Sequence, residues 1–251
     1  MKLSQLLYLI QETADKKNIS QPFICGGIPR DKLLGRLQAI NDLDITTGDD
    51  TVHDLAKELA LTFKGKNSNF KIMSDGHAQL MIGNFKVDFS SNFQSPNINN
   101  ILKKIGISNP TNMQKEIYSR DFTCNSLLLS LDLKIISDPL GLGVNDINKR
   151  ILKPCLSPEI TFINSPKRIP RIIYLASKLN FDVDPKIIEW VKNHASLINN
   201  VNKKYLTTKI ISGFNYNPQK TIKLLDDMNL WPYLPIIEEL VPHMSKKISR
   251  I

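Results

Sequence analysis

The chain has 251 residues, 41% hydrophobic and 23% charged, which is enough for one large domain or two modest ones with their own cores. Its formal net charge of +9 favours a polyanion such as nucleic acid as a partner. The three cysteines are widely spaced, without a C-x-x-C pair or clustered histidines, which argues against a disulfide framework and a zinc site. A reducing intracellular compartment, the cytoplasm or an organelle, is therefore expected.

The N-terminal sequence MKLSQLLYLIQETADKK predicts an amphipathic helix. Ser4, Gln5 and Gln11 make it too polar for the core of a signal peptide. No run in the chain approaches the roughly 20 apolar residues that a membrane-spanning helix needs. We therefore expect no membrane partner.

Short β-type runs alternate with helical segments between residues 20 and 90, which predicts the α+β class. Helices are expected at residues 29–34 and 51–63, with Asp49 and Asp50 as candidate N-caps of the second. Residues 91–112 are rich in Asn, Ser and Pro and predict a long mobile loop. The expected strands are QPFIC, DLDITT, FKIMS, AQLMIG and FKVDFSS.

The next segment, MQKEIYSRDFTCNSLLLSLD, predicts a helix, and KIIS predicts a short strand before a turn at DPLGLG. Beyond residue 156 the β-type runs fade, and the segments PKRIPRIIYLASKLN, DPKIIEWVKNHA and PQKTIKLLDDMNL have a helical period. We therefore expect a small mixed β-sheet with flanking helices in residues 1–150, followed by an all-helical bundle in residues 151–251.

Asp42 and Asp44 are two residues apart in a β-type run, so both side chains lie on one face of the strand. Crowded carboxylates favour a cation between them, and magnesium is the usual occupant of an all-oxygen site. Asp88 would complete a cage for two ions if its run pairs beside the first. Such a cage can activate a hydroxyl and hold a triphosphate. A D-x-D pattern alone is also common on solvated strands, so the prediction depends on its neighbours.

Gly26 and Gly27 precede the carboxylates and are expected to end a strand and begin a helix. Without a Cβ, their backbone can approach phosphate oxygens closely. Arg30 and Arg36 add cations that can donate paired hydrogen bonds to the same oxygens. A Gly-Gly pair alone is more often a plain turn, and it is the order of these features at close spacing that indicates function.

This order resembles the signature of class II tRNA nucleotidyltransferases and bacterial-type poly(A) polymerases, within the DNA polymerase β-like nucleotidyltransferase superfamily. Pro29 stands where the family usually has Val. The resemblance implies a nucleotidyltransferase head in residues 1–150 and a helical neck, truncated relative to the family, in residues 151–251. The matching residues are Gly26, Gly27, Arg30, Asp31, Leu33, Leu34, Gly35, Arg36, Asp42, Asp44 and Thr46.

The segment YSRDFTCNSLLL resembles the family's Arg-Arg-Asp-Phe-Thr-x-Asn motif, with Ser119 in place of the first Arg. The resemblance implies that Arg120, Asp121 and Asn125 contact the sugar and triphosphate of an incoming nucleotide. The alternative is a helix N-cap with buried polar partners.

The segment INSPKRIPRIIYLASKLNF resembles the family helix that reads the base of the incoming nucleotide. Arg168 and Arg171 keep its basic positions and are implied to contact the base, although they could instead form only a solvated face. Ser165 replaces the base-reading Asp, and Tyr174 stands where a third Arg is frequent. Pro170 should cost about 3 kcal/mol inside a helix. Base selection is therefore expected to be relaxed or achieved differently.

The resemblance implies a metal-dependent, template-independent enzyme with two Mg²⁺ ions as cofactors and ATP and CTP as substrates. In this interpretation Asp42, Asp44 and Asp88 are catalytic, and Asp42 and Asp44 bind both ions. The preferred reaction is CCA addition or repair at the 3′ end of tRNA, with release of pyrophosphate. Poly(A) addition to RNA is the alternative, and a catalytically inactive RNA-binding scaffold is the alternative from another class.

RNA would be held by the neck and by the remaining basic surface, and a protein partner or a dimer could supply RNA-gripping helices that the family carries beyond the neck. The candidate basic residues are Lys192, Lys203, Lys204, Lys209, Lys246, Lys247 and Arg250.

Overall fold

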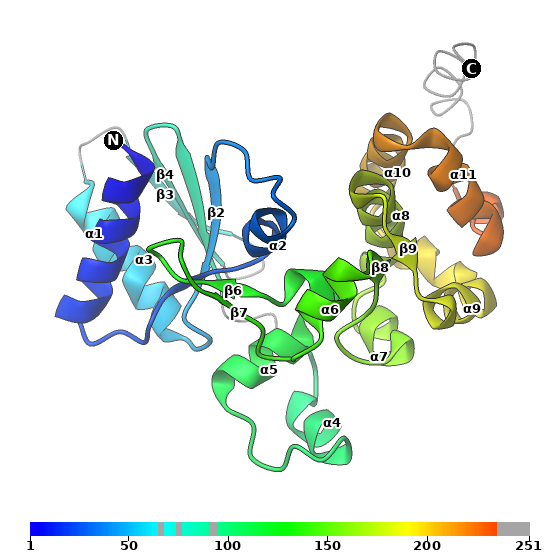
Figure 1. Ribbon diagram of the computed structural model, residues 1–251, viewed down its shortest axis with the longest axis horizontal. Helices are drawn as coiled ribbons and strands as arrows, with labels where there is room; N and C mark the ends of the chain where they lie inside the picture. Colours follow the sequence, from blue (N-terminus) through cyan, green and yellow to red (C-terminus); the bar gives the residue numbers. More distant parts are fainter. Residues whose placement is uncertain (65–67, 74–76, 91–94, 235–251) are drawn as a thin grey trace. The chain divides into compact units, whose positions relative to one another are not determined.

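The structure is a computed structural model and describes residues 1–64, 68–73, 77–90 and 95–234 (Figure 1). The chain divides into two compact units, Met1–Asn145 and Asp146–Ile251. Within the described residues, no helix is both long and apolar enough to cross a membrane.

A seven-stranded mixed sheet organises the first unit, in the order β3-β4-β5-β2-β1-β6-β7. β2 pairs in parallel with β5, whereas the other neighbours pair antiparallel. The strand runs predicted between residues 20 and 90 and at KIIS are confirmed. The strands are β1 (Phe23–Ile24), β2 (Asp42–Thr46), β3 (Ser68–Ile72), β4 (Ala78–Ile82), β5 (Phe85–Phe89), β6 (Leu128–Leu129) and β7 (Ile136–Ser137).

Two helices, α1 (Leu3–Lys16) and α3 (Thr51–Thr62), pack on each other, and α3 also packs on β3, β4 and β5 (Figure 1). Both were predicted from the sequence, and their apolar stripes join one core with alternate residues of the strands. This core includes Leu6, Ile10, Leu43, Ile45, Leu55, Leu59, Leu80 and Val87. Because successive strand residues point to opposite faces, the residues between these core positions lie on the other face of the sheet.

The remaining helical segments of this unit are α2, α4, α5 and η1, and two predictions made for them are wrong. Residues 91–112 are not all loop, because Ile98 and Leu102 are buried one turn apart and support a helix; residues 91–94 lie outside the described residues. The helix predicted from MQKEIYSRDFTCNSLLLSLD ends at Ser119, and its apolar run joins the sheet as β6, since a short apolar run suits a buried strand as well as a helix. The bounds are α2 (Gly27–Leu33), α4 (Ile98–Lys104), α5 (Asn112–Ser119) and η1 (Thr123–Asn125).

The second unit consists mainly of helices, with α8 packed on α10 and α11. Gly213 permits close contact there, since a Cβ at this position would lie 3.0 Å from Thr221 Oγ1. The all-helical prediction is wrong for one short parallel pair, β8 (Ile151–Leu152) with β9 (Asp182–Val183). The helical segments are α6 (Gly143–Asn148), which begins in the first unit, then α7 (Pro158–Ile163), α8 (Arg168–Leu179), α9 (Pro185–Asn193), η2 (Ala195–Asn200), α10 (Lys203–Tyr216), α11 (Pro218–Asp227) and η3 (Trp231–Tyr233).

Asp49 organises the start of α3. Its carboxylate accepts hydrogen bonds from Thr51 N at 3.1 Å, Thr47 Oγ1 at 2.9 Å and Ser20 Oγ at 2.6 Å. Partial burial opposes its charge, but these donors outweigh burial and lower the pKa of Asp49. Asp50 occupies the N-cap position, yet its side chain makes no capping hydrogen bond. Of the two predicted candidates, Asp49 therefore performs the capping.

We expect Asp49→Ala to lower the free energy of unfolding by about 1–2 kcal/mol at neutral pH, because several donors lose their acceptor. The folded pKa lies below the unfolded value of about 3.9, so this stability is present above pH 3.9 and is lost as pH falls through the folded pKa. Urea unfolding at several pH values measures the difference, and Asp50→Ala is the matched control. An equal loss in both variants, or a loss independent of pH, would contradict this role.

Candidate active site

Carboxylates from two strands gather on the face of the sheet opposite the core. β2 carries Asp42 and Asp44, and the parallel register places Asp88 of β5 directly beside Asp44. Leu43 and Val87, the residues between them, are fully buried in the core. The predicted placement of two same-face carboxylates with a third on a neighbouring strand is thereby confirmed, while their catalytic and metal-binding roles stay predictions.

Lys86 supplies positive charge among these carboxylates. Its Nζ lies 3.1 Å from Asp42 Oδ1 and also contacts Asp88 Oδ2. Partial burial disfavours the ammonium, but the hydrogen bonds to Asp88 and Asp42 outweigh burial and raise the pKa of Lys86. Gln79 Nε2 donates to Asp88 Oδ1 at 2.8 Å. The alternation in Lys-Val-Asp already places Lys86 on the face of Asp88, and this signal in the sequence was missed.

The Asp44 carboxyl is open to solvent on one side, yet protein atoms crowd its other sides. Lost hydration raises its pKa, Arg120 opposes this, and the neighbouring Asp88 and Asp42 raise it further. The cluster therefore favours an additional cation. Among the described residues, no group of three or more Asp, Glu, His or Cys side chains is already arranged to hold a metal ion.

Gly26 brings the backbone directly against Asp44. Its φ of 74° lies in the left-handed region, and a Cβ would lie 2.5 Å from Asp44 Oδ2, so only glycine fits. Cys25 N also donates to Asp44 O at 2.9 Å. As predicted, the glycines join a strand, which ends at Ile24, to a helix, which begins at Gly27. Their contact with phosphate stays a prediction.

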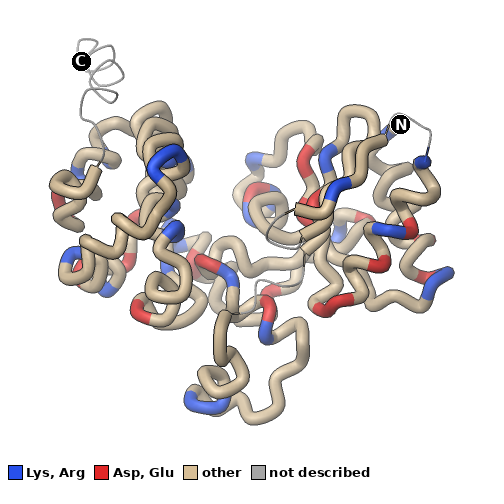
Figure 2. The backbone as a smooth tube through the Cα atoms, turned by 180° about the vertical axis from the view of Figure 1, so that it is seen from behind, with Lys and Arg blue, Asp and Glu red and all other residues tan. Residues whose placement is uncertain are grey.

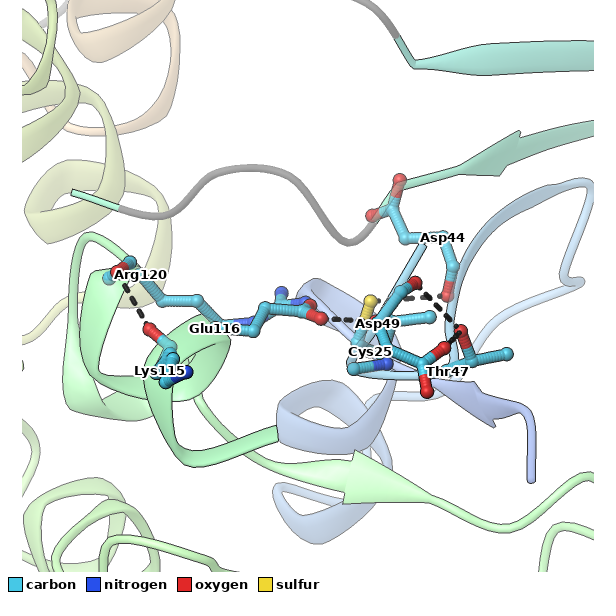
Figure 3. Close-up of polar contacts among 10 residues, drawn as sticks. Cys25, Asp44, Thr47, Asp49, Lys115, Glu116 and Arg120 are labelled. Atoms are coloured by element: carbon cyan, nitrogen blue, oxygen red, sulfur yellow. Dashed lines mark hydrogen bonds and ion pairs between the residues drawn. The ribbon is translucent and has the colours of Figure 1, made fainter. Parts of the chain in front are cut away.

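Glu116 of α5 pairs with Arg120 at the end of the same helix and is hydrogen-bonded to Thr46 of β2. Glu116 is 0% exposed; its Oε1 lies 2.5 Å from Arg120 Nη2, and Thr46 Oγ1 donates to its Oε2 at 2.5 Å. Figure 3 shows the Glu116 side chain extending from α5 toward the strand region. Burial raises the pKa of the adjacent Cys25 thiol to about 12, so Glu116 rather than a thiolate balances Arg120. The i,i+4 spacing of Glu116 and Arg120 was a second missed signal.

A second polar chain joins α2 to η1. Arg30 is 3% exposed, and its Nη1 donates to Asn125 Oδ1 at 2.6 Å while its Nε donates to Asp31 Oδ1 at 2.8 Å. Asn125 Nδ2 in turn donates to Asp121 Oδ1 at 3.1 Å. Arg30 therefore points into the protein and positions Asn125. Nucleotide contacts by Arg30, Arg120, Asp121 and Asn125 stay predictions.

Ser119, which departs from the resembling motif, is buried and has its own partners. Its Oγ accepts from Ser95 N at 2.8 Å and donates to Lys115 O at 2.7 Å. A hydroxyl fits this enclosed position between two backbone groups. The serine thereby ties the end of α5 to the chain segment that precedes α4.

Other predicted residues lie in the segment after α2, in the second unit or outside the described residues. Arg36 is exposed between α2 and β2. Arg168 begins α8, Arg171 follows one turn later, and Ser165 lies before the helix, where its carbonyl accepts from Arg168 N at 2.9 Å. Pro170 falls in the first turn, where backbone N–H groups have no partner within the helix. The predicted destabilisation by a proline in the helix interior is therefore wrong. Lys246, Lys247 and Arg250 lie outside the described residues.

Comparison with known proteins gives a consistent match. The Poly A polymerase head domain family matches residues 22–153, more than half of the chain. The tRNA nucleotidyltransferase cca2 of Schizosaccharomyces pombe is 27% identical over 210 residues, covering 75% of this chain and 43% of that protein. The A-adding tRNA nucleotidyltransferase of Aquifex aeolicus is 29% identical over 182 residues, covering 70% and 20% respectively. The chain thus spans less than half the length of these two relatives.

Among solved structures, the Bacillus stearothermophilus CCA-adding enzyme in complex with CTP superposes with a TM-score of 0.70 at 20% sequence identity. The match covers 95% of this chain and 55% of that one. At this identity the similarity shows the fold, including the sheet with its flanking helices.

We expect Glu116→Gln to lower the free energy of unfolding by about 3 kcal/mol, because it leaves the guanidinium of Arg120 buried without its countercharge. If the glutamine oxygen accepts from Thr46, its NH2 group faces the guanidinium, so Arg120 loses both its countercharge and its acceptor. Urea unfolding measures the loss, and the double variant Glu116→Gln/Arg120→Met should recover part of it. A loss below about 1 kcal/mol would mean that the ion pair contributes no more than a solvated one.

Proposed function

Because the chain belongs to the Poly A polymerase head domain family, we propose that it is a template-independent, metal-dependent RNA nucleotidyltransferase. It adds nucleotides from CTP or ATP to the 3′ end of tRNA and releases pyrophosphate. The observation that carries this proposal is the alignment of Asp42, Asp44 and Asp88 on one face of the sheet.

The donor set on this face fits magnesium. Carboxylate oxygens are the ligands that Mg²⁺ prefers. Lost hydration, followed by the repulsion of Asp88 and Asp42, raises the pKa of Asp44, and a bound cation would relieve that repulsion. We assign Asp42 and Asp44 as ligands of two Mg²⁺ ions and Asp88 as the third carboxylate. When bound, the ions would supply the charge that activates the 3′-hydroxyl of the RNA and stabilises the leaving pyrophosphate.

The chain's own residues would position the nucleotide. Gly26 and Gly27 let the backbone approach the triphosphate, and the exposed Arg36 can reach its oxygens. Arg30 is buried and acts through Asn125, which it holds by a hydrogen bond.

The nucleotide's sugar and base would be bound by other groups. Asp121 and Asn125, joined by a hydrogen bond, would contact the sugar, and Arg120 is placed nearby by Glu116. Arg168 and Arg171 on α8 would contact the base.

The reaction product is the second part of the proposal. CCA addition or repair is our first choice, because the named relatives are tRNA nucleotidyltransferases. Poly(A) addition is the second candidate, favoured by Ser165, since a serine hydroxyl both donates and accepts and so discriminates bases less sharply than a carboxylate. A protein partner or a second copy of the chain would help to hold the RNA. Cys25, Cys124 and Cys155 are buried thiols, which supports a reducing cytoplasmic location.

We expect Asp42→Asn, Asp44→Asn and Asp88→Asn each to lower nucleotide incorporation by about 100-fold or more while leaving the fold intact. The assay supplies labelled single triphosphates with tRNA lacking its terminal residues or with a generic oligonucleotide, and Asp50→Asn is the matched control. Ordered addition of C, C and A to tRNA alone supports CCA addition, whereas A added to both RNAs supports poly(A) addition. No incorporation by the natural chain would contradict the proposal that the chain is an enzyme and would favour an inactive RNA-binding scaffold.

Lys86 should compete with Mg²⁺, because its ammonium occupies the space between Asp42 and Asp88. We therefore expect Lys86→Met, which keeps the aliphatic stem, to lower the Mg²⁺ concentration that half-maximally stabilises the protein against heat. The matched control is Lys57→Met on α3, which removes an exposed lysine paired with Asp54. An unchanged or higher Mg²⁺ requirement in Lys86→Met would show that the lysine does not compete.

A further inference from the structure

Tyrosine rings and lysine ammonium groups gather on α8 and α10 of the second unit. Lys209 Nζ lies 4.6 Å from the ring centroid of Tyr174 and 5.4 Å from that of Tyr205. Lys178 Nζ lies 5.8 Å from the Tyr174 ring and 5.9 Å from the Tyr216 ring. The rings of Tyr174 and Tyr216 are 6.0 Å apart and inclined by 59°. We call these five residues the aromatic–basic face.

The fold holds this face in place through the packing of α8 on α10. Tyr174 and Lys178 are one turn apart on α8, and Tyr205 and Lys209 are one turn apart on α10. The opposite sides of both helices are buried, so the partly exposed tyrosines and lysines keep one orientation. The buried residues of the two helices include Ile169, Ile172, Ile173, Ala176, Leu206, Ile210 and Phe214.

The positive charge of the two helices is not balanced within them. Neither α8 nor α10 contains an Asp or a Glu, and Figure 2 marks the Lys and Arg residues along their backbone. Partial burial lowers the pKa of Lys209, and the neighbouring cations Arg171 and Lys178 lower it further. The attraction of each ammonium to the tyrosine rings holds the lysines in place, and an anionic ligand would relieve the repulsion among the cations. The cations of the two helices are Arg168, Arg171, Lys178, Lys203, Lys204 and Lys209.

We propose that the aromatic–basic face binds unpaired nucleotides of an RNA strand, with bases stacked on the tyrosine rings and phosphates paired with Lys178 and Lys209. The inference rests on the proposed function, since an enzyme that extends an RNA end must hold the nucleotides before that end. Stacking on aromatic side chains together with backbone contacts to cations is the usual chemistry of single-strand binding. A duplex hides the faces of its bases, so it could not stack on the tyrosine rings. A polyglutamate-like acidic peptide could pair with the lysines but has no aromatic rings to stack on the tyrosines.

Binding without catalysis tests the face directly. The probe is a fluorescein-labelled single-stranded RNA of about ten nucleotides, within the usual site size, and fluorescence anisotropy is measured at several salt concentrations without triphosphates or Mg²⁺. Tyr216→Leu removes the most accessible ring, which is 53% exposed, and Tyr8→Leu on α1, 64% exposed, is its matched control. Lys178→Ala/Lys209→Ala removes both ammonium groups, and Lys57→Ala/Lys223→Ala, at two exposed lysines outside the face, is its control.

We expect Tyr216→Leu to weaken binding about tenfold at every salt concentration and to leave the salt dependence unchanged, because it removes stacking. The double lysine variant should reduce the slope of log K against log salt by about 0.7 for each phosphate that no longer pairs with a lysine. Both controls should bind like the natural chain. Thermal midpoints like that of the natural chain would show that the variants are folded.

The proposal would be overturned if Tyr216→Leu and the double lysine variant both bound the RNA as tightly as the natural chain does. So would competition by duplex RNA or polyglutamate as strong as that by single-stranded RNA. RNA binding that depends on the face, in a chain that incorporates no nucleotide, would support the face and contradict the proposed function. Nucleotide incorporation by the natural chain, together with unchanged RNA binding in both variants, would support the proposed function and contradict the face.

Discussion

The parallel pairing of β2 with β5 is the constraint on which the candidate site depends. It places Asp44 opposite Asp88 and leaves Leu43 and Val87 on the core side. A shift of register by one residue would turn carboxylates into the core and leucine and valine into solvent. The apolar core under α1 and α3 therefore fixes the carboxylate face, and the repulsion that this face creates is offset by Lys86.

Polar residues expected to contact a nucleotide also hold the elements together. Arg120 is paired with the buried Glu116, which accepts a hydrogen bond from Thr46 at the end of β2. Arg30 reaches across the unit to Asn125. Removing one partner leaves a buried charge or donor unsatisfied, which destabilises the fold. The same residues therefore stabilise the fold and hold the candidate site in one conformation. The carboxylates are held in a similar way, because Asp42 and Asp88 share the ammonium of Lys86.

Local patterns allowed much of the fold to be predicted from the sequence. Alternation placed Asp42 and Asp44 on one face, and helical periods located α1, α3, α8 and α9. The rest depends on distant partners: β6 forms because Leu129 pairs with Ile24, and Ser119 is satisfied by Ser95. Pro170 was judged by the helix interior, although α8 begins only two residues earlier. Neighbouring residues alone do not determine whether a short apolar run becomes a strand, where a helix begins, or which distant group a side chain bonds to.

The central claim is that the face of Asp42, Asp44 and Asp88 transfers nucleotides to an RNA 3′ end. The most direct measurement compares the pyrophosphate released with the nucleotides incorporated into RNA, using the purified chain, ATP or CTP, and tRNA lacking its 3′-terminal residues. The account predicts one pyrophosphate for each nucleotide incorporated, dependent on the RNA and on Mg²⁺. Triphosphate turnover without RNA extension, or neither product at any Mg²⁺ concentration, would contradict it.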